Sequence, residues 1–360
     1  MQQSSRREFL RLAACAALAN SFVDLTARPT SSRELEGSLQ RDAPQAQPKA
    51  IRLGLISDLN GSYGSTRYGS TVERGVALLK QHKPDLVLCA GDMVAGQNPA
   101  LSDKQLRAMW RGFETSVRLP LQNAGIPLFP AMGNHDASSQ RSGGRWIYAR
   151  ERVQASIFWQ QRRDALPPGL LEAETYPFFY AWRRPGLFIV VLDASSAAIG
   201  NTQRQWLFDV LRSEHRRKDD LCLVVGHLPL TAFSEGRARA GECIDNAESL
   251  AAELRRARVD LVISGHHHAW YPSEALGLRL LSLGAMGSGP RRLIGSAKPA
   301  SASLTLVDWS ASAQTVKETT LSLTNNLLPL QVATLPEQIL VSGFPAARRR
   351  STNWQRETWR

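Results

Sequence analysis

The chain has 360 residues, of which 43% are hydrophobic and 21% are charged. These proportions are those of a globular protein and exclude disordered and fibrous classes. Lysine and arginine number 44 against 32 acidic residues, a formal charge of +12. This charge suits anionic partners such as phosphorylated substrates, anionic lipid or nucleic acid, but we favour the interpretation that it only keeps the protein soluble. The four cysteines include no CxxC pair, and no apolar run reaches the roughly 20 residues that span a membrane.

Residues 1–27 are typical of an export signal. Residues 5–11 read SRREFLR, a twin arginine followed by a short apolar run that ends in small residues. This stretch resembles a twin-arginine signal, with Arg where the usual core has a final Lys. The resemblance implies contact with the twin-arginine translocation machinery and a bacterial periplasmic or secreted location. Residues 28–50, rich in Pro, Gln and Ser, are expected to form a linker.

From residue 51 onward, apolar runs alternate with amphipathic stretches. Short apolar runs indicate buried strands, and apolar residues with a 3.6-residue period indicate helices. Strands are expected at residues 51–58, 85–91, 126–132, 178–182, 187–192, 221–226, 261–264, 280–283 and 304–309. Helices are expected at residues 72–81, 103–123, 203–216 and 247–258. The alternation predicts one α/β domain over residues 51–325. A basic, mobile C-terminal tail is expected over residues 326–360.

Polar side chains stand directly after five of the predicted strands. The runs are SDLN (Asp58, Asn60), AGDM (Asp92), MGNHD (Asn134, His135, Asp136), VGHLP (His227) and SGHHH (His266, His268). A single Asp after a strand is often a helix cap, and a single His is often structural. Five such runs in succession, most with an adjacent Gly, indicate a shared site, because ligands collect at strand C-termini in open α/β sheets.

In this order the runs resemble the signature of the calcineurin-like metallophosphoesterase superfamily. That signature is Asp-x-His, Gly-Asp, Gly-Asn-His-Asp/Glu, Gly-His and Gly-His-x-His. Residues 203–213, QRQWLFDVLRS, resemble a Gln-x-x-Trp-Leu helix that many members carry. The resemblance covers roughly residues 51–310. It implies a two-layer β sandwich flanked by helices, with two divalent metal ions (Mn, Fe, Zn or Mg) at one edge.

The resemblance also assigns roles to the residues. The metal ligands are Asp92 as the bridge, Asp58 and His268 on the first ion, and Asn134, His227 and His266 on the second. His135 contacts the phosphate and protonates the leaving oxygen, and Asp136 orients it. His266 and His268 are expected to face the same way on an extended segment, with His267 facing away. These roles imply hydrolysis of phosphomonoesters or phosphodiesters by a hydroxide that bridges both ions.

Asn60 departs from the signature, which usually has His at this position. Asn60 either ligates the first metal through its amide oxygen or only hydrogen-bonds nearby, which leaves that metal weakly bound, completed by water or absent. We favour ligation, since a neutral oxygen donor suits Mn²⁺ or Mg²⁺.

Tyr63, Arg67, Arg141 and Arg145 lie close to the motifs in sequence and are candidates to contact substrate. Tyr63 and Arg67 equally suit an ordinary surface loop, whereas for Arg141 and Arg145 we favour solvated side chains. Two alternatives to the phosphoesterase remain. One is a nuclease of the same superfamily, which the positive charge favours although no compact basic stripe supports it. The other is a metal-poor protein that binds phosphate groups without turnover. Seven candidate ligands together with His135 argue against that binding protein.

Overall fold

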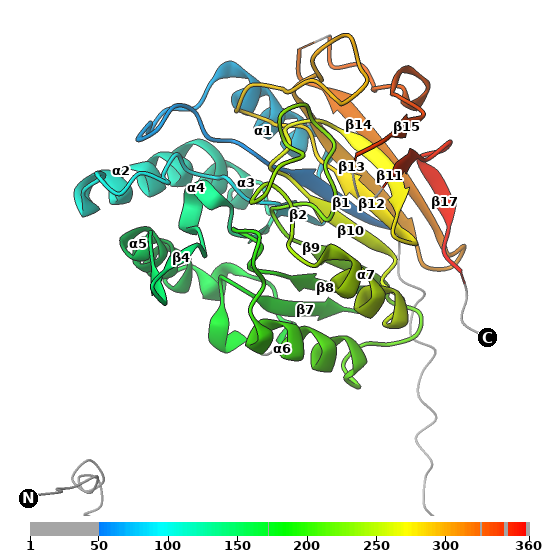
Figure 1. Cartoon of the computed structure of the whole chain (residues 1–360), viewed down its shortest axis with the longest axis horizontal. Helices are drawn as coiled ribbons and strands as arrows, with labels where there is room; N and C mark the ends of the chain where they lie inside the picture. The colour runs from blue at the N-terminus through cyan, green and yellow to red at the C-terminus, as the bar shows by residue number, and fades with distance from the viewer. Residues whose placement is uncertain (1–49, 172, 325, 342–344, 358–360) are drawn as a thin grey trace, which may run out of the picture. The chain divides into compact units, whose positions relative to one another are not determined.

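Two mixed β-sheets form the centre of the structure, a computed structural model that describes residues 50–171, 173–324, 326–341 and 345–357 (Figure 1). In the first sheet, β1, β2 and β3 are parallel and β13 is antiparallel to β1. Its strands, in spatial order, are β17 (Asn353–Gln355), β14 (Thr315–Ser322), β13 (Ser303–Ser310), β1 (Ile51–Ile56), β2 (Leu86–Cys89) and β3 (Leu128–Pro130).

The second sheet has a parallel centre, in which β8, β9, β10 and β12 follow one another. Its strands, in spatial order, are β15 (Gln338–Ile339), β16 (Ala346–Arg348), β11 (Tyr271–Ala275), β12 (Leu278–Ser282), β10 (Leu261–Ser264), β9 (Leu221–Val225), β8 (Leu187–Val191), β7 (Tyr180–Arg184) and β6 (Leu170–Leu171). β7 and β8 form an antiparallel hairpin over two of the predicted strands. A separate ribbon pairs β4 (Arg141–Ser142) with β5 (Arg145–Trp146).

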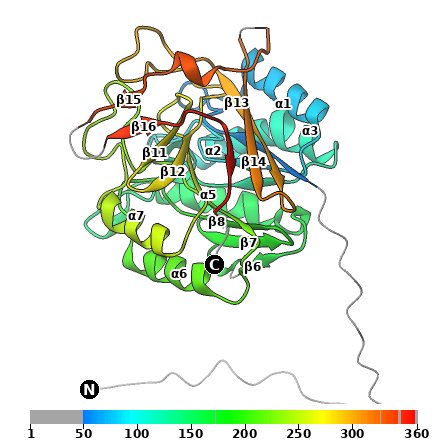
Figure 2. The same cartoon turned by 90° about the vertical axis from the view of Figure 1, so that its right-hand side faces the viewer.

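The side chains of β8 show how the layers are built. Leu187, Ile189 and Val191 belong to a core that also contains residues of the first sheet. Phe188 and Val190 belong to a second core with α6 (Asn201–Arg212) and α7 (Ala247–Arg256). Alternate residues of a strand face opposite sides, so one sheet contributes to both cores. Figure 2 shows α6 and α7 beside this sheet. The predicted sandwich with flanking helices is therefore confirmed.

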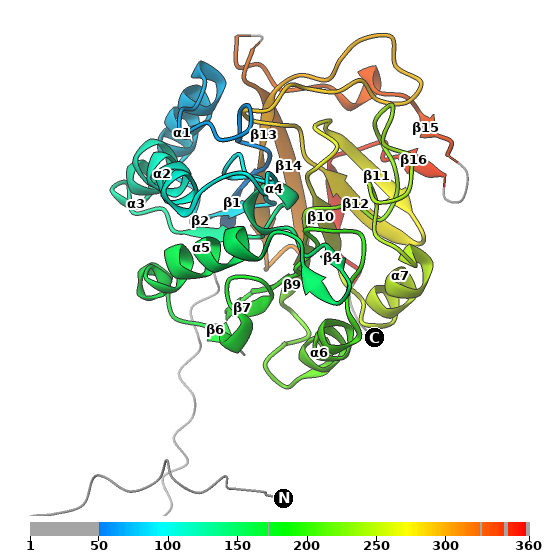
Figure 3. The same ribbon diagram turned by 60° about the vertical axis from the view of Figure 1, so that its left-hand side comes forward.

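The remaining helices pack against the first of these two cores, which lies between the sheets (Figure 3). They are α1 (Ser70–His82), α2 (Asp103–Phe113), α3 (Leu119–Gln122), α4 (Asn134–Ala137) and α5 (Ala149–Gln160). A π-helical segment, Glu114–Arg118, joins α2 to α3, so the predicted helix over residues 103–123 is continuous. Gly54 of β1 lets α1 approach closely, because a Cβ there would lie 2.6 Å from Leu79. Short 3₁₀ turns occupy Arg163–Ala165, Ala173–Thr175 and Val332–Thr334.

The described part of the chain after residue 325 is not the mobile tail that the sequence suggested. β15 and β16 extend the second sheet, and β17 pairs with β14 of the first. Buried Arg349 donates two hydrogen bonds of 2.8 Å to Glu318, and buried Arg356 donates one of 2.9 Å to Asp260. The arginines that suggested a tail therefore hold these strands in place.

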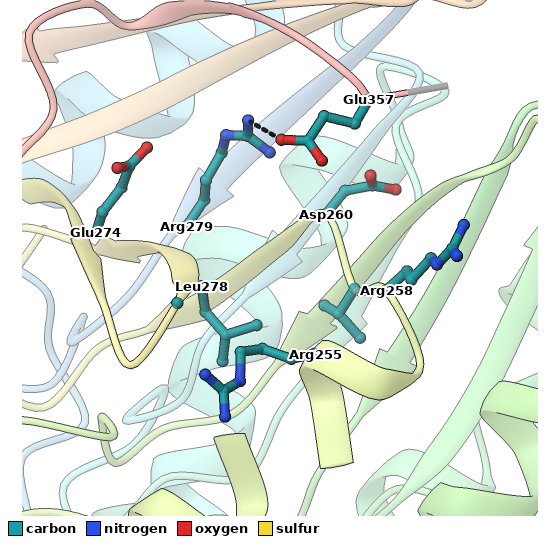
Figure 4. A pocket seen from close by; sticks show the side chains of 9 residues that line it. Arg255, Arg258, Asp260, Glu274, Leu278, Arg279 and Glu357 are labelled. Carbon is teal, nitrogen blue, oxygen red and sulfur yellow. Dashed lines mark ion pairs between the residues drawn. The ribbon is translucent and has the colours of Figure 1, made fainter. Parts of the chain in front are cut away.

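A cavity of about 640 Å³ lies beside these C-terminal contacts. Figure 4 shows Arg279 and Glu357 pointing toward one another at its edge, 3.8 Å apart. None of the nine residues that line it is a predicted site residue. The chemistry that the sequence predicts therefore lies elsewhere.

The expected export signal and all of the expected linker except Ala50 lie outside the described residues. Within the residues that the structure describes, no helix combines the length and apolar character needed to cross a bilayer.

Candidate metal centre

The polar residues that follow the predicted strands meet at one edge of the two sheets. Asp58, Asp92 and Asn134 follow β1, β2 and β3 of the first sheet, while His227 and His266 follow β9 and β10 of the second. Ligand atoms of Asp58, Asp92 and His227 all lie within 4.8 Å of one another, and the three residues are at most 1% exposed. The fold thus brings together residues that are far apart in sequence.

Four candidate ligands have a backbone conformation that is rare for residues other than glycine. The φ angles are +55° at Asp58, +56° at Asp92, +66° at His266 and +54° at His268. A left-handed residue turns the chain sharply after a strand and costs roughly 1 kcal/mol. Strain of this kind clusters at functional sites. His266 and His268 therefore face the site from a turn, and the expected extended segment is wrong.

Asp58 binds the second sheet directly. Its carboxylate accepts the backbone N–H of His266 at 3.1 Å, and its Oδ1 lies 3.2 Å from Nε2 of His268. Nδ1 of His268 donates to the carbonyl oxygen of Gly289 at 3.0 Å, which leaves Nε2 to face the carboxylate. A carboxylate and an imidazole nitrogen are thereby presented to the same point, as a shared metal ion requires.

Asp92 lies at the centre of the group. Its Oδ2 is 3.3 Å from Nε2 of His227, and its Oδ1 accepts the backbone N–H of His135 at 2.9 Å. Burial disfavours the ionised carboxylate, but His227 and His135 hold the pKa of Asp92 well below its usual range. The charged carboxylate has oxygens on both sides, which suits the predicted bridging role.

His227 is fixed by the strand next to it. Nδ1 donates to the carbonyl oxygen of Ala90 at 2.7 Å, so Nε2 faces both Asp92 and Oδ1 of Asn134, the latter at 2.9 Å. Gly91 makes room for the ring, because its φ is +97° and a Cβ there would lie 2.5 Å from Nδ1. Burial disfavours the charged ring, but Asp92 and Asp58 raise the pKa of His227 to about 9.

Asn134 is held by a residue that the sequence did not indicate. Its Nδ2 donates to Oε1 of Gln97 at 2.8 Å, which points Oδ1 toward His227. Glu151 of α5 accepts the backbone N–H groups of Gln97 and Asn98 at 2.9 and 3.0 Å and so secures that loop. Gln97 therefore orients the amide of Asn134, and Glu151 in turn holds Gln97, so the amide oxygen is positioned to bind a cation.

His266 is oriented by Glu242, which the sequence also did not indicate. Nε2 of His266 donates to Oε2 of Glu242 at 2.9 Å, so Nδ1 is the nitrogen left for a metal. Burial lowers the pKa of His266 to about 4, and the ring is neutral near pH 7. Glu242 also pairs with Arg237 and Arg239.

His267 has the structural role expected of it. Its Nδ1 accepts the N–H of Phe233 at 3.1 Å, and its Nε2 donates to the carbonyl oxygen of Glu242 at 3.1 Å. Both ring nitrogens are therefore used within the protein, and neither is left for a metal.

The side chain of Asn60 is buried next to Asp58 and has a partner. Its Oδ1 accepts a hydrogen bond from the hydroxyl of Ser288, whose own N–H donates to the carbonyl oxygen of Asp58 at 2.9 Å. An amide oxygen has two lone pairs, so it can accept this hydrogen bond and still bind a cation. Ligation by Asn60 therefore stays a prediction.

His135 and Asp136 have different surroundings. Nδ1 of His135 donates to the carbonyl oxygen of Gly96 at 3.0 Å, and Nε2 lies 3.9 Å from Oδ2 of Asp92. Asp136 is buried and accepts the N–H groups of Val94 and Gly133 at 2.9 and 2.8 Å. Burial and the charge of Asp92 raise the pKa of Asp136 to about 7. His135 thus lies next to Asp92. Asp136 connects the loop that carries His135 to the loop that carries Asp92.

A cavity of about 1490 Å³ lies beside the cluster and includes Asn134, His135 and His266 among its lining residues. Tyr63 also lines the cavity, and its ring centroid lies 5.2 Å from that of His135. Arg141 lines it as well, whereas Arg67 and Arg145 are not among its described lining residues. Of the four predicted substrate contacts, the structure therefore places two at the cavity.

The donor set fits divalent cations. Ligand atoms of the buried carboxylates Asp58 and Asp92 lie within 4.8 Å of each other, and the positive charge of a protonated His227 offsets only one of these two negative charges, so a divalent cation is favoured there. The neighbouring Asn134 oxygen and the nitrogens of His227 and His266 complete a mixed oxygen and nitrogen set, which suits Mn²⁺, Fe and Zn²⁺.

Comparisons with known proteins agree with this geometry. Residues 51–270 match the family model described as calcineurin-like phosphoesterase. A phosphoenolpyruvate phosphatase of Allium cepa is 29% identical over 231 residues, which are 63% of this chain and 43% of that protein. The chain thus spans less than half the length of that relative.

Two solved structures share the fold. A dimetal phosphatase from Danio rerio has a TM-score of 0.52 at 15% identity, covering 76% of this chain and 97% of that one. GAP50, the anchor in the inner membrane complex of Plasmodium, has a TM-score of 0.51 at 12% identity, covering 78% and 88%. The family match covers well over half of the chain, so the protein belongs to the calcineurin-like phosphoesterase family.

Proposed function

We propose that this protein is an exported phosphatase that hydrolyses phosphate esters with two divalent metal ions. The observation that carries the proposal is the buried cluster of Asp58, Asp92 and His227, whose ligand atoms lie within 4.8 Å of one another. The name of the Allium cepa relative, a phosphatase, favours monoesters over diesters.

The residues divide between two cation positions. Asp58, His268 and Asn60 would hold one ion, Asn134, His227 and His266 the other, and Asp92 both. When bound, two divalent ions activate water and draw negative charge from the phosphate in the transition state.

The protein's own groups complete the reaction. His135 lines the cavity and its Nδ1 donates to the Gly96 carbonyl oxygen, so Nε2 is the nitrogen that would donate a proton to the leaving oxygen. Asp136 keeps the loop of His135 next to that of Asp92. The surrounding fold thus orients the imidazole of His135 before the substrate binds.

The test measures metal content and turnover on the same samples. Full-length protein and its Asn60→His, His135→Ala and Asp92→Asn variants are purified without added metal and analysed by elemental mass spectrometry. Turnover of p-nitrophenyl phosphate and its bis ester is then measured with and without Mn²⁺. We expect close to two ions per wild-type chain, and loss of turnover in His135→Ala without loss of metal. Absence of turnover in wild type and Asn60→His, at any metal loading, would refute the proposal.

We further propose export by the twin-arginine route. The support is the sequence of residues 5–11. Residues 1–50 fused to a fluorescent protein that folds in the cytoplasm should reach the bacterial periplasm. The Arg6→Lys/Arg7→Lys double variant should stay in the cytoplasm. Equal export of both fusions would contradict the twin-arginine assignment.

A further inference from the structure

The cavity is too large for a phosphate group alone. Its volume of about 1490 Å³ exceeds the roughly 300–1,000 Å³ typical of pockets for small molecules. Of the candidate metal ligands, Asn134 and His266 are among its lining residues, and His135 also lines it. The other lining residues are therefore available to contact the part of the substrate that leaves.

One wall of the cavity is the β4–β5 ribbon. Its turn, Gly143-Gly144, has φ angles of +55° and +77°, which are the signs a tight two-residue hairpin needs. Arg141 and Trp146 form a cross-strand pair, and the guanidinium lies 3.5 Å above the ring centroid. Both side chains line the cavity. Stacking thus holds the charge of Arg141 at the cavity wall.

Arg152 of α5 connects the ribbon to the rest of the domain. The Arg152 guanidinium lies 4.3 Å from the centroid of Trp146, donates to the carbonyl oxygen of Ala137 at 2.7 Å and pairs with Asp193 at 2.8 Å. Arg152 is buried, and its charge is matched by Asp193. The position of Arg141 is therefore set by the fold before any ligand binds.

Among the residues that the structure describes, Arg141 is the arginine of the cavity that has no acidic partner. Arg237 and Arg239 both pair with Glu242, and Arg152 pairs with Asp193. Among the described residues, the only hydrogen bond that Arg141 makes is to the carbonyl oxygen of Gly144, at 3.2 Å. A guanidinium has five N–H donors, so most of those of Arg141 are free for a ligand.

We propose that Arg141 binds a second acidic group of the substrate. The preferred substrate is then a phosphate ester whose leaving group itself carries a carboxylate or a phosphate. This inference rests on the proposed phosphatase function. A guanidinium recognises both acidic groups through the same planar pair of N–H donors.

The test measures binding with non-hydrolysable ligands, so that it does not depend on turnover. The ligands are phenylphosphonate, its 3-carboxy and 4-carboxy derivatives, and 1,4-phenylene bisphosphonate. Their affinities for the Mn²⁺-loaded full chain are measured by calorimetry. The proteins are wild type, Arg141→Gln, Arg141→Lys and Arg212→Gln. Arg212 is the matched control, because it is an exposed arginine 4.7 Å from the ring of Phe208 and does not line the cavity.

We expect at least one acidic derivative to bind wild type about tenfold more tightly than phenylphosphonate, the gain of one charge-assisted pair. Arg141→Gln should abolish this preference, Arg141→Lys should keep part of it, and Arg212→Gln should keep all of it. Comparing the carboxylates with the bisphosphonate tells which acidic group is preferred. A preference that is absent in wild type, or that survives in Arg141→Gln, would overturn the inference.

Two further readouts separate the alternatives. If phenyl phosphate is not hydrolysed but the preference depends on Arg141, the anion subsite stands and the proposed phosphatase function fails. If only a short single-stranded oligonucleotide loses affinity in Arg141→Gln, while the small ligands do not, the subsite is one for nucleic acid and the inference is wrong.

Discussion

Glu242 accepts the Nε2 proton of His266 at 2.9 Å, and this bond decides which nitrogen of that imidazole faces the metal centre. The hydrogen bond from His266, together with Arg237, holds the pKa of Glu242 well below its usual range. The carboxylate is thus charged, buried and fixed, and it strengthens His266 as a donor in the way that carboxylate–histidine–metal groupings do.

Removal of Glu242 should weaken metal binding. We expect Glu242→Ala to raise the Kd for Mn²⁺ by roughly 10–100-fold, the usual effect of losing an outer partner of a histidine ligand. Calorimetry on the metal-free chain gives the affinity directly. Glu235 offers a control, since it lies in the same loop and pairs with Arg292 at the surface. An affinity in Glu242→Ala equal to that in Glu235→Ala would show that the bond does not orient the ligand.

Gln97 should matter for turnover through Asn134. In Gln97→Leu the Asn134 amide loses the acceptor of its N–H group, so its oxygen is no longer kept toward His227. We expect kcat/KM for p-nitrophenyl phosphate to fall about tenfold. Gln97→Glu retains an acceptor at the same place and should lose much less. Equal losses in the two variants would point to a packing effect instead.

Metal binding should release a proton from His227. Its pKa of about 9 in the metal-free protein means that the ring is charged at pH 7.5, whereas a metal needs the neutral nitrogen. Binding of Mn²⁺ should therefore release about one proton per chain, and affinity should rise with pH up to about 9. Calorimetry in buffers of different ionisation enthalpy counts the protons. No proton release at pH 7.5 would contradict the expectation.

The raised pKa of His227 also predicts how the stability of the metal-free fold changes with pH. The folded-state pKa of His227 lies above the ordinary value of 6.5, so its charged form stabilises the metal-free fold. This contribution is complete below pH 6.5 and is lost as the pH rises through about 9. Urea unfolding of the metal-free chain at pH 6 and pH 9.5 measures the difference.

The ion pair between Arg349 and Glu318 should be needed for stability. Arg349→Leu leaves a carboxylate that is 2% exposed without its partner, and such a loss costs about 3–5 kcal/mol of unfolding free energy. The Arg349→Leu/Glu318→Leu double variant should recover part of this, because no charge is then left buried. Exposed Arg350 is the control, and Arg350→Leu should be neutral. A neutral Arg349→Leu in urea unfolding would mean that the C-terminal strands do not depend on this pair.

The predicted metal ligands were identifiable because each lies next to a strand that the sequence makes obvious. An apolar run followed by Gly and a polar residue is a local pattern, and the sheet brings such positions together. Glu242, Gln97 and Ser288 lie in loops and carry no such pattern. Their roles depend on contacts with His266, Asn134 and Asn60 that only the folded chain creates.

Some of the elements that the sequence did not predict have a similar explanation. α5 lacks an apolar stripe because its buried face includes Glu151, Arg152 and Gln154. Glu151 and Arg152 hold the loops around the site, so the polar residues that support the site also remove the apolar period by which the helix could be predicted. β15, β16 and β17 have two or three residues each, too few to show a period.

The bond from the His266 N–H to Asp58 joins residues 208 positions apart and connects the two sheets. An unfolded chain would have to close that entire loop to bring these ligands together, at a large entropic cost. We therefore expect that metal ions do not nucleate folding here. We expect both sheets to assemble first and the cations to enter a centre that is already built. A chelator present during refolding should leave the formation of the sheets unaffected and prevent only the final gain of activity.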